Sequence, residues 1–155
     1  MTEPPQALPV AGVFRRLFAM LYDGLLVLAI IMAGTAAAIG VRVWLSGADA
    51  AVADPDTAAH GPLFQLWLLL LIVSFFTLFW RWKGQTLGMQ AWRLKVRNSD
   101  GSQLSIRQCL LRLLAGLLSW CCLGLGYWVI VFNPAKGSWS DSWSKSECVV
   151  VPKKN

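Results

Sequence analysis

A long apolar run that contains a single carboxylate constrains this chain more than any other feature. Residues 17–41 make up twenty-five positions, and the only charged side chain among them is that of Asp23. A helix rises about 1.5 Å per residue, so this run can cross a hydrocarbon core of ~30 Å with some tilt. It is also longer than the apolar part of a cleaved secretory signal. The run therefore predicts a transmembrane helix that is retained in the protein.

Asp23 and Arg16 fall on one face of this helix. They are seven residues apart, which places the carboxylate about 10 Å deeper in the membrane than the guanidinium group. Small residues, among them Ala19 and Gly34, occupy the same face and permit close packing. An unpaired charge at that depth costs ~2.5 kcal/mol or more, so we expect Asp23 to have a partner.

The composition is that of a membrane domain. Apolar residues make up 56% of the chain and charged residues only 14%, against about 25% charged in ordinary soluble domains. The net charge of +6 comes from basic residues that flank apolar segments, so it does not predict nucleic-acid binding. The four cysteines lack metal-ligand spacing, and no nucleophile–base pair or carboxylate cluster is recognisable. We expect no metal, no cofactor and no enzymatic activity.

The distribution of charge predicts the topology. A second apolar run at residues 63–82 predicts a second span, with tryptophans near both of its ends. Residues 42–62 carry one positive and three negative charges, whereas residues 81–107 carry six positive charges and one negative. By the positive-inside rule the N-terminus and the basic loop are cytoplasmic. We expect an N-terminal tail at 1–11, a membrane domain at 12–151 and a C-terminal tail at 152–155.

The basic loop contains two local patterns. Residues 92–97 alternate apolar and basic side chains and lead into a turn sequence at 98–101, which predicts a short cytoplasmic β-hairpin. Its basic face would contact anionic lipid headgroups, or the charges would serve topology alone. Before it, two glycines bracket polar residues and predict a tight bend with close backbone approach; these residues are Gly84, Gln85, Thr86 and Gly88.

A third hydrophobic region, residues 105–132, begins as a helix with polar and small residues on one stripe. Arg112 lies on that stripe at almost the depth of Asp23. We therefore predict an intramembrane ion pair between Asp23 and Arg112. In the alternative, Arg112 extends to the headgroups while Asp23 stays protonated.

Glycines at 124 and 126 interrupt the third region and leave two topologies open. A single crossing would place the C-terminal tail outside, whereas a re-entrant hairpin would keep it inside. Four lysines against two acids in the tail favour the inside. Only there could residues 149–151 pair with residues 94–96, and we favour this arrangement. The fold class is then an all-α membrane protein with two transmembrane helices, this third region, and the small β element.

Taken in order, these motifs resemble the bacterial RDD family. The matching positions are Arg16, Asp23, the motif at 84–88, residues 94–96 with Asp100 and Gly101, Arg112, and Asp141 before residues 149–151. The family is named for one arginine and two aspartates, which correspond to Arg16, Asp23 and Asp141. The resemblance implies a multi-pass protein of the bacterial inner membrane, for which transport is the activity usually suggested.

Two functions use the same residues. In the first, a transporter or transporter component binds an ion or a small polar solute at Asp23, with Arg112 as the counter-charge. Three hydrophobic segments are too few to enclose a pathway, so a homo-oligomer or another membrane protein would complete it. In the second, a non-catalytic scaffold or assembly factor uses the pair to fix the register of its helices.

Overall fold

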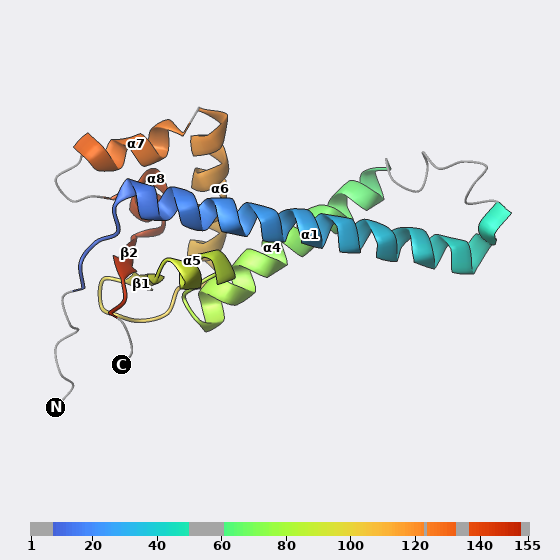
Figure 1. Ribbon diagram of the computed structural model, residues 1–155, viewed down its shortest axis with the longest axis horizontal. Helices are drawn as coiled ribbons and strands as arrows, with labels where there is room; N and C mark the ends of the chain where they lie inside the picture. The colour runs from blue at the N-terminus through green and yellow to red at the C-terminus, as the bar shows by residue number, and fades with distance from the viewer. Residues whose placement is uncertain (1–7, 50–60, 123, 133–136, 153–155) are drawn as a thin grey trace. The chain divides into compact units, whose positions relative to one another are not determined.

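The computed structural model describes residues 8–49, 61–122, 124–132 and 137–152 (Figure 1). Two compact units share these residues, one made of residues 1–23 with 76–155 and the other of residues 24–75. The elements in chain order are α1 (Val13–Ser46), α4 (Pro62–Trp82), α5 (Leu87–Ala91), β1 (Leu94–Asn98), α6 (Ile106–Cys121), α7 (Leu125–Phe132), α8 (Trp139–Ser144) and β2 (Ser146–Val150).

Helices α1 and α4 are the two elements long and apolar enough to cross a bilayer. They have 34 and 21 residues, with four charged side chains in α1 and one in α4. Nearly all of the apolar stretch of α1 and all of that of α4 lies outside the protein core, whereas a core helix of a soluble protein would be largely covered. The large apolar side chains therefore face outward, as contact with lipid requires. The two predicted spans are present as apolar helices.

Within the unit of residues 24–75, a small residue allows close helix packing. A Cβ atom at Gly34 would lie 2.5 Å from Cδ1 of Leu71, and the Nε1 of Trp67 donates to the carbonyl oxygen of Gly34 at 3.2 Å. Gly34 lies on the predicted α1 stripe, which also includes the buried Ala19 and Asp23. The predicted inward face of α1 is thus confirmed.

The third hydrophobic region forms two short helices. α6 has 16 residues and α7 has 8, and at about 1.5 Å per residue neither reaches the ~30 Å of a hydrocarbon core. The chain turns at Gly124, whose φ is +80° and whose N–H donates to the carbonyl of Ser119 at 2.7 Å. A continuous helix from 108 to 132 is therefore wrong. No third spanning helix is found among the described residues.

Small residues let α7 pack back against α6. A Cβ atom at Gly126 would lie 2.6 Å from Oγ of Ser119, and one at Gly116 would lie 3.2 Å from the hydroxyl of Tyr127. The stripe predicted on α6 is the packed face, since Arg112 and Ser119 are buried while Leu117 is exposed.

β1 pairs with the C-terminal strand. The antiparallel register sets Leu94 opposite Val150 and Val96 opposite Cys148, and both β1 side chains are 1% exposed. The predicted alternation is confirmed, but the predicted β-hairpin is wrong. The turn at 98–101 is present, yet the residues after it lead directly into the capping box that starts α6 at Ser105. No length of chain remains there for a returning strand.

The N-terminal segment joins the same sheet. Val10 forms a bridge with Val149, and the N–H of Ala11 donates to the carbonyl of Cys148 at 2.9 Å. The small core of this unit lies beneath these contacts and includes Leu104 and Cys109. Residues 10–11, β1 and β2 therefore lie on one side of the membrane. A single crossing by the third region would separate β2 from β1, so the pairing favours the predicted tail on the side of the basic loop.

We expect cysteine labelling to report this sidedness. A cysteine at exposed Pro152 should react with a membrane-impermeant maleimide from the same side as one at exposed Lys83, and from the opposite side to one at Asp49. The background needs only Cys121→Ala and Cys122→Ala, because Cys109 and Cys148 are buried and burial raises the pKa of the Cys148 thiol. Reaction of the Pro152 and Asp49 positions from one side would contradict the shared sheet.

Candidate functional site

Asp141 is positioned by the start of a short helix. Ser138 caps α8, and its hydroxyl accepts from the N–H of Asp141 at 3.3 Å. In return the Asp141 carboxylate accepts from the N–H of Ser138 at 3.1 Å. This reciprocal capping box fixes the carboxylate at the N-terminal end of α8.

Two arginines bind the two oxygens of that carboxylate. Arg16 of α1 donates to Oδ2 of Asp141, and Arg112 of α6 donates to Oδ1 at 2.7 Å. Arg16, Arg112 and Asp141 are 5%, 6% and 5% exposed. We call these three residues the arginine–aspartate cluster. Because its members come from distant parts of the chain, the cluster holds α1, α6 and α8 together.

The remaining contacts of the two arginines connect the cluster to neighbouring segments of the chain. The Nε of Arg16 donates to the carbonyl of Ala11 at 3.1 Å, just before α1 begins. Arg112 donates to the hydroxyl of Ser146, the first residue of β2, at 2.6 Å. Its guanidinium carbon also lies 5.6 Å from the ring centroid of Trp80, within the range of a cation–π interaction.

The charge state of Asp141 follows from these neighbours. Burial alone would raise the pKa of its carboxyl, but the guanidinium groups of Arg112 and Arg16 lower that pKa to about 2. The carboxylate is therefore ionised at neutral pH. Two guanidinium groups share one carboxylate, so the cluster carries one positive charge in excess.

Asp23 occupies a second, separate site. Its Oδ2 accepts from the hydroxyl of Thr86 at 2.5 Å and its Oδ1 from the N–H of Gly88 at 2.9 Å. The Thr86 hydroxyl also accepts from the N–H of Met89 as the N-cap of α5. The carboxylate is thus bound at the start of α5 by a hydroxyl and a backbone N–H.

The predicted ion pair of Asp23 and Arg112 is wrong. Arg112 is bound by Asp141, and Asp23 has no basic partner among the described residues. Similar depth in the membrane does not decide the partners, for two reasons. Neutral donors can satisfy a buried carboxylate, and an acid from the C-terminal part of the chain can reach Arg112.

The loop motif at 84–88 contacts β1 with its first residues and Asp23 with its last, through the close backbone approaches that its glycines predict. Gly84 has a φ of +68°, and its carbonyl accepts from the N–H of Val96 at 2.7 Å. Gln85 donates from Nε2 to the carbonyl of Leu94 at 2.7 Å. A Cβ atom at Gly88 would lie 2.7 Å from Oδ1 of Asp23, so only glycine fits there. The motif joins β1 to α1 by way of the carboxylate.

A group of serines around Asp141 was not recognised from the sequence. Their hydroxyls link to one another and to the arginine–aspartate cluster; the residues are Ser138, Ser140, Ser144 and Ser146. The spacing of Ser138 and Asp141 is a capping-box pattern that could have located the first of them. Over the described part of the chain, no group of three His, Cys, Asp or Glu side chains is arranged to hold a metal ion.

Two exposed apolar helices, joined to a unit whose interior holds a charged cluster, define a membrane protein. The model of the RDD family matches residues 10–145, which is most of the chain. The chain therefore belongs to the RDD family, and the resemblance seen in its motifs is confirmed. Comparisons with curated proteins and with solved structures gave no match.

We expect Asp141→Asn to be severely destabilising, because it leaves two buried guanidinium groups without a counter-charge. The expected loss is ~3–5 kcal/mol, measured by thermal unfolding in detergent. Asp100→Asn is the matched control, since Asp100 is exposed and, in the part of the chain that the structure describes, bonds within its own turn. Its expected loss is below about 1 kcal/mol. Equal losses for the two variants would contradict the cluster.

The same cluster predicts an acid-sensitive stability. The pKa of Asp141 is below its ordinary value of 3.8 in the folded protein, so its ionised form stabilises the fold above that pH. This contribution should disappear as the pH falls from about 3.8 to about 2. The melting temperature of the wild type should therefore fall further over this pH range than that of Asp141→Asn.

Double variants test how the charges are partnered. Arg112→Gln combined with Asp141→Asn should lower the free energy of unfolding by less than the sum of the two single losses, because the two substitutions remove the same contact. Arg112→Gln combined with Asp23→Asn should be additive, because those residues have separate partners. Additive losses for Arg112→Gln with Asp141→Asn, together with a less than additive loss for Arg112→Gln with Asp23→Asn, would instead support an ion pair between Asp23 and Arg112.

Gly88→Ala tests the close approach at Asp23. The new methyl group would meet the Asp23 carboxylate and the backbone oxygen of Ala19, so we expect a loss of about 1–3 kcal/mol. Gly24→Ala is the control, because a Cβ atom there has nothing within 4 Å and alanine favours a helix by up to about 1 kcal/mol. A Gly88→Ala protein as stable as Gly24→Ala would contradict the geometry.

Proposed function

We propose that this RDD-family protein is a transporter, or a component of one, for an ion or a small polar solute. The observation that carries the proposal is the state of Asp23. This carboxylate is 5% exposed on an apolar helix and, among the described residues, is held only by a hydroxyl and a backbone N–H. It can take up a proton or cation without leaving an arginine unpaired, which a buried salt-bridge carboxylate cannot do.

Binding at Asp23 would be coupled to the loop that contains α5. An ionised carboxylate accepts from both Thr86 and Gly88, whereas a protonated one has a weaker acceptor and gains a donor hydrogen. Protonation would therefore loosen the attachment of α5 to α1. The Asp/Arg mechanism is revised accordingly: Asp23 is the exchanging group, and Arg16, Arg112 and Asp141 hold the surrounding fold.

The proposal includes a location and partners. Two spanning helices are too few to enclose a pathway, so a homo-oligomer or a second membrane protein would complete it. We propose a bacterial inner membrane with the N-terminus and the basic loop in the cytoplasm, following the positive-inside rule. Exposed basic side chains, among them Arg15, Lys83, Arg93 and Arg107, would contact anionic headgroups there. The role is not enzymatic.

A non-catalytic scaffold or assembly factor is the second candidate. It is favoured by the arginine–aspartate cluster, which ties α1, α6 and α8 together and gives the unit a fixed surface. In this function Asp23 would be a structural cap for α5. Partners would bind the exposed apolar helices.

Proteoliposome flux separates the two functions. Purified protein is given a Na⁺ or K⁺ gradient, and an entrapped pH-sensitive dye reports proton-linked flux. Asp23→Asn should abolish the flux while the protein stays inserted and folded, because asparagine cannot exchange a proton or bind a cation as a carboxylate does. Asp49→Asn, on an exposed residue, should retain it. Thr86→Val keeps the carboxylate and should shift the pH dependence of the flux without abolishing it.

Full flux in a correctly inserted Asp23→Asn protein would refute the role of the carboxylate. For a scaffold, no variant would show flux, and Asp23→Asn would lower only the recovery of partner proteins.

A further inference from the structure

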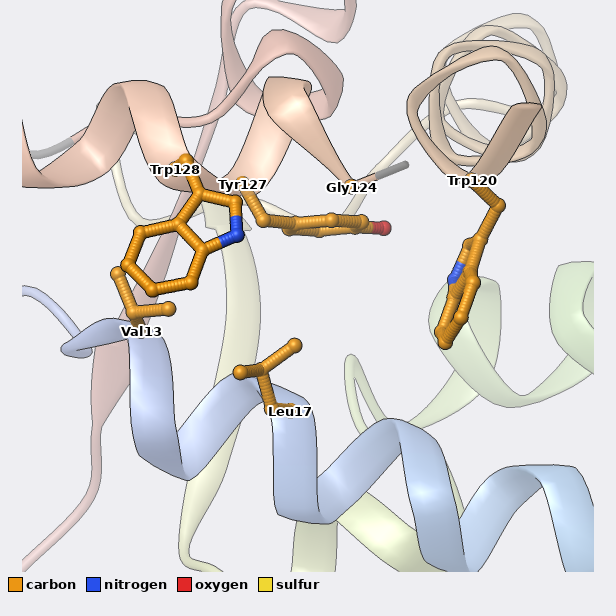
Figure 2. Close-up of a pocket in the computed structure, with 6 residues that line it drawn as sticks. All are labelled: Val13, Leu17, Trp120, Gly124, Tyr127 and Trp128. Atoms are coloured by element: carbon orange, nitrogen blue, oxygen red, sulfur yellow. The ribbon is translucent and has the colours of Figure 1, made fainter. Parts of the chain in front are cut away.

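A cavity of about 290 Å³ lies among the first turns of α1, the end of α6 and the start of α7 (Figure 2). Its lining consists of Val13, Leu17, Trp120, Gly124, Tyr127 and Trp128. We call it the Tyr127 pocket. Trp120 and Trp128 are 61% and 53% exposed, so the pocket opens to the exterior of the protein. Figure 2 shows the ring of Tyr127 between the two indoles.

Hydroxyl groups lie between this pocket and the arginine–aspartate cluster. Burial raises the pKa of the Tyr127 phenol, and the interaction of its hydroxyl with Ser140 lowers that pKa. The Oγ of Ser140 lies 2.8 Å from the Oγ of Ser138, and the Ser138 hydroxyl donates to Oδ2 of Asp141 at 3.0 Å. One wall of the pocket is thus only a few side chains from the cluster.

Among the described residues, no second carboxylate contacts the arginines of the cluster, so one positive charge is not neutralised by direct contact. Asp141 neutralises one of the two guanidinium groups, and the nearby Glu147 is bound to Arg97. The other titratable groups that face the cluster are Tyr127, Cys109 and Cys148, which are uncharged at neutral pH. The buried Nε of Arg112 has no hydrogen-bond partner in the described structure. An excess charge in an apolar interior acts over a longer distance than in water.

We propose that the Tyr127 pocket binds one acyl chain of an anionic phospholipid, and that the positive charge of the cluster selects the anionic headgroup. The apolar and aromatic walls suit a hydrocarbon chain, and indoles at the rim are typical of the membrane interface. A free inorganic anion would gain nothing from these walls. The site differs from the exposed basic loop, because its selectivity comes from buried charge.

Native mass spectrometry of the full-length protein tests the site. Detergent-solubilised protein is incubated with equal amounts of phosphatidylglycerol and phosphatidylcholine that carry the same acyl chains. We expect about fivefold more retained phosphatidylglycerol, as one additional charge at a membrane surface produces. Leu17→Trp should fill the pocket and abolish the preference. Leu21→Trp, one turn further along α1 at an exposed position outside the pocket, should leave it intact.

Equal retention of the two lipids by the wild type would overturn the proposal, and so would an unchanged preference in Leu17→Trp. Displacement of phosphatidylglycerol by millimolar inorganic phosphate would also overturn it, by indicating a site for a free anion. Loss of the preference in Lys95→Gln with an intact pocket would assign the lipid to the basic loop instead. If Leu17→Trp does not fold, Trp128→Ala removes a pocket wall and is expected to abolish the preference in the same way.

Discussion

The fold of the first unit depends on the contact between one carboxylate and two guanidinium groups. Asp141 is separated by 125 residues from Arg16 and by 29 from Arg112, so the contact forms only when α1, α6 and α8 have come together. Each group is buried, and removal of Asp141 would leave two guanidinium groups without a counter-charge in surroundings where they cannot be solvated. The arginines also bind Ala11 and Ser146, which flank the junction of the N-terminal segment with β2. A small apolar core is thereby fixed in one arrangement.

The two buried aspartates have opposite surroundings, which suggests different roles. Asp141 lies between two arginines, and its pKa of about 2 keeps it ionised under any physiological condition. Asp23 is held by a hydroxyl and a backbone N–H at the start of α5. A carboxylate with neutral partners can change its protonation at lower cost than one between two cations. This contrast is the reason for proposing exchange at Asp23 and a stabilising role for Asp141.

The parts of the fold that the sequence predicted are those set by the surrounding lipid and by local pattern. α1 and α4 follow from apolar length, and the buried face of α1 follows from helical periodicity. The glycines at 84 and 88 indicated close approach without naming the approaching group. The partners of Asp23 and Arg112 were not predictable from charge and depth. A hydroxyl and a backbone N–H bind Asp23, and an aspartate from a distant part of the chain binds Arg112. The pairing of β1 with the C-terminal strand was predicted on the condition that the tail lies on the side of the basic loop, and it joins residues about fifty positions apart, as in the register of Arg97 with Glu147.

Hydrogen–deuterium exchange on Asp141→Asn tests most directly whether the arginine–aspartate cluster holds this unit together. In the wild type the N–H groups of Ala11 and Val150 are bonded across the junction, to Cys148 and Pro9. If the cluster fastens these segments, both N–H groups should exchange faster in the variant and by similar factors, while exchange within α4 stays unchanged. Faster exchange confined to α8, with Ala11 and Val150 protected as in the wild type, would contradict this account.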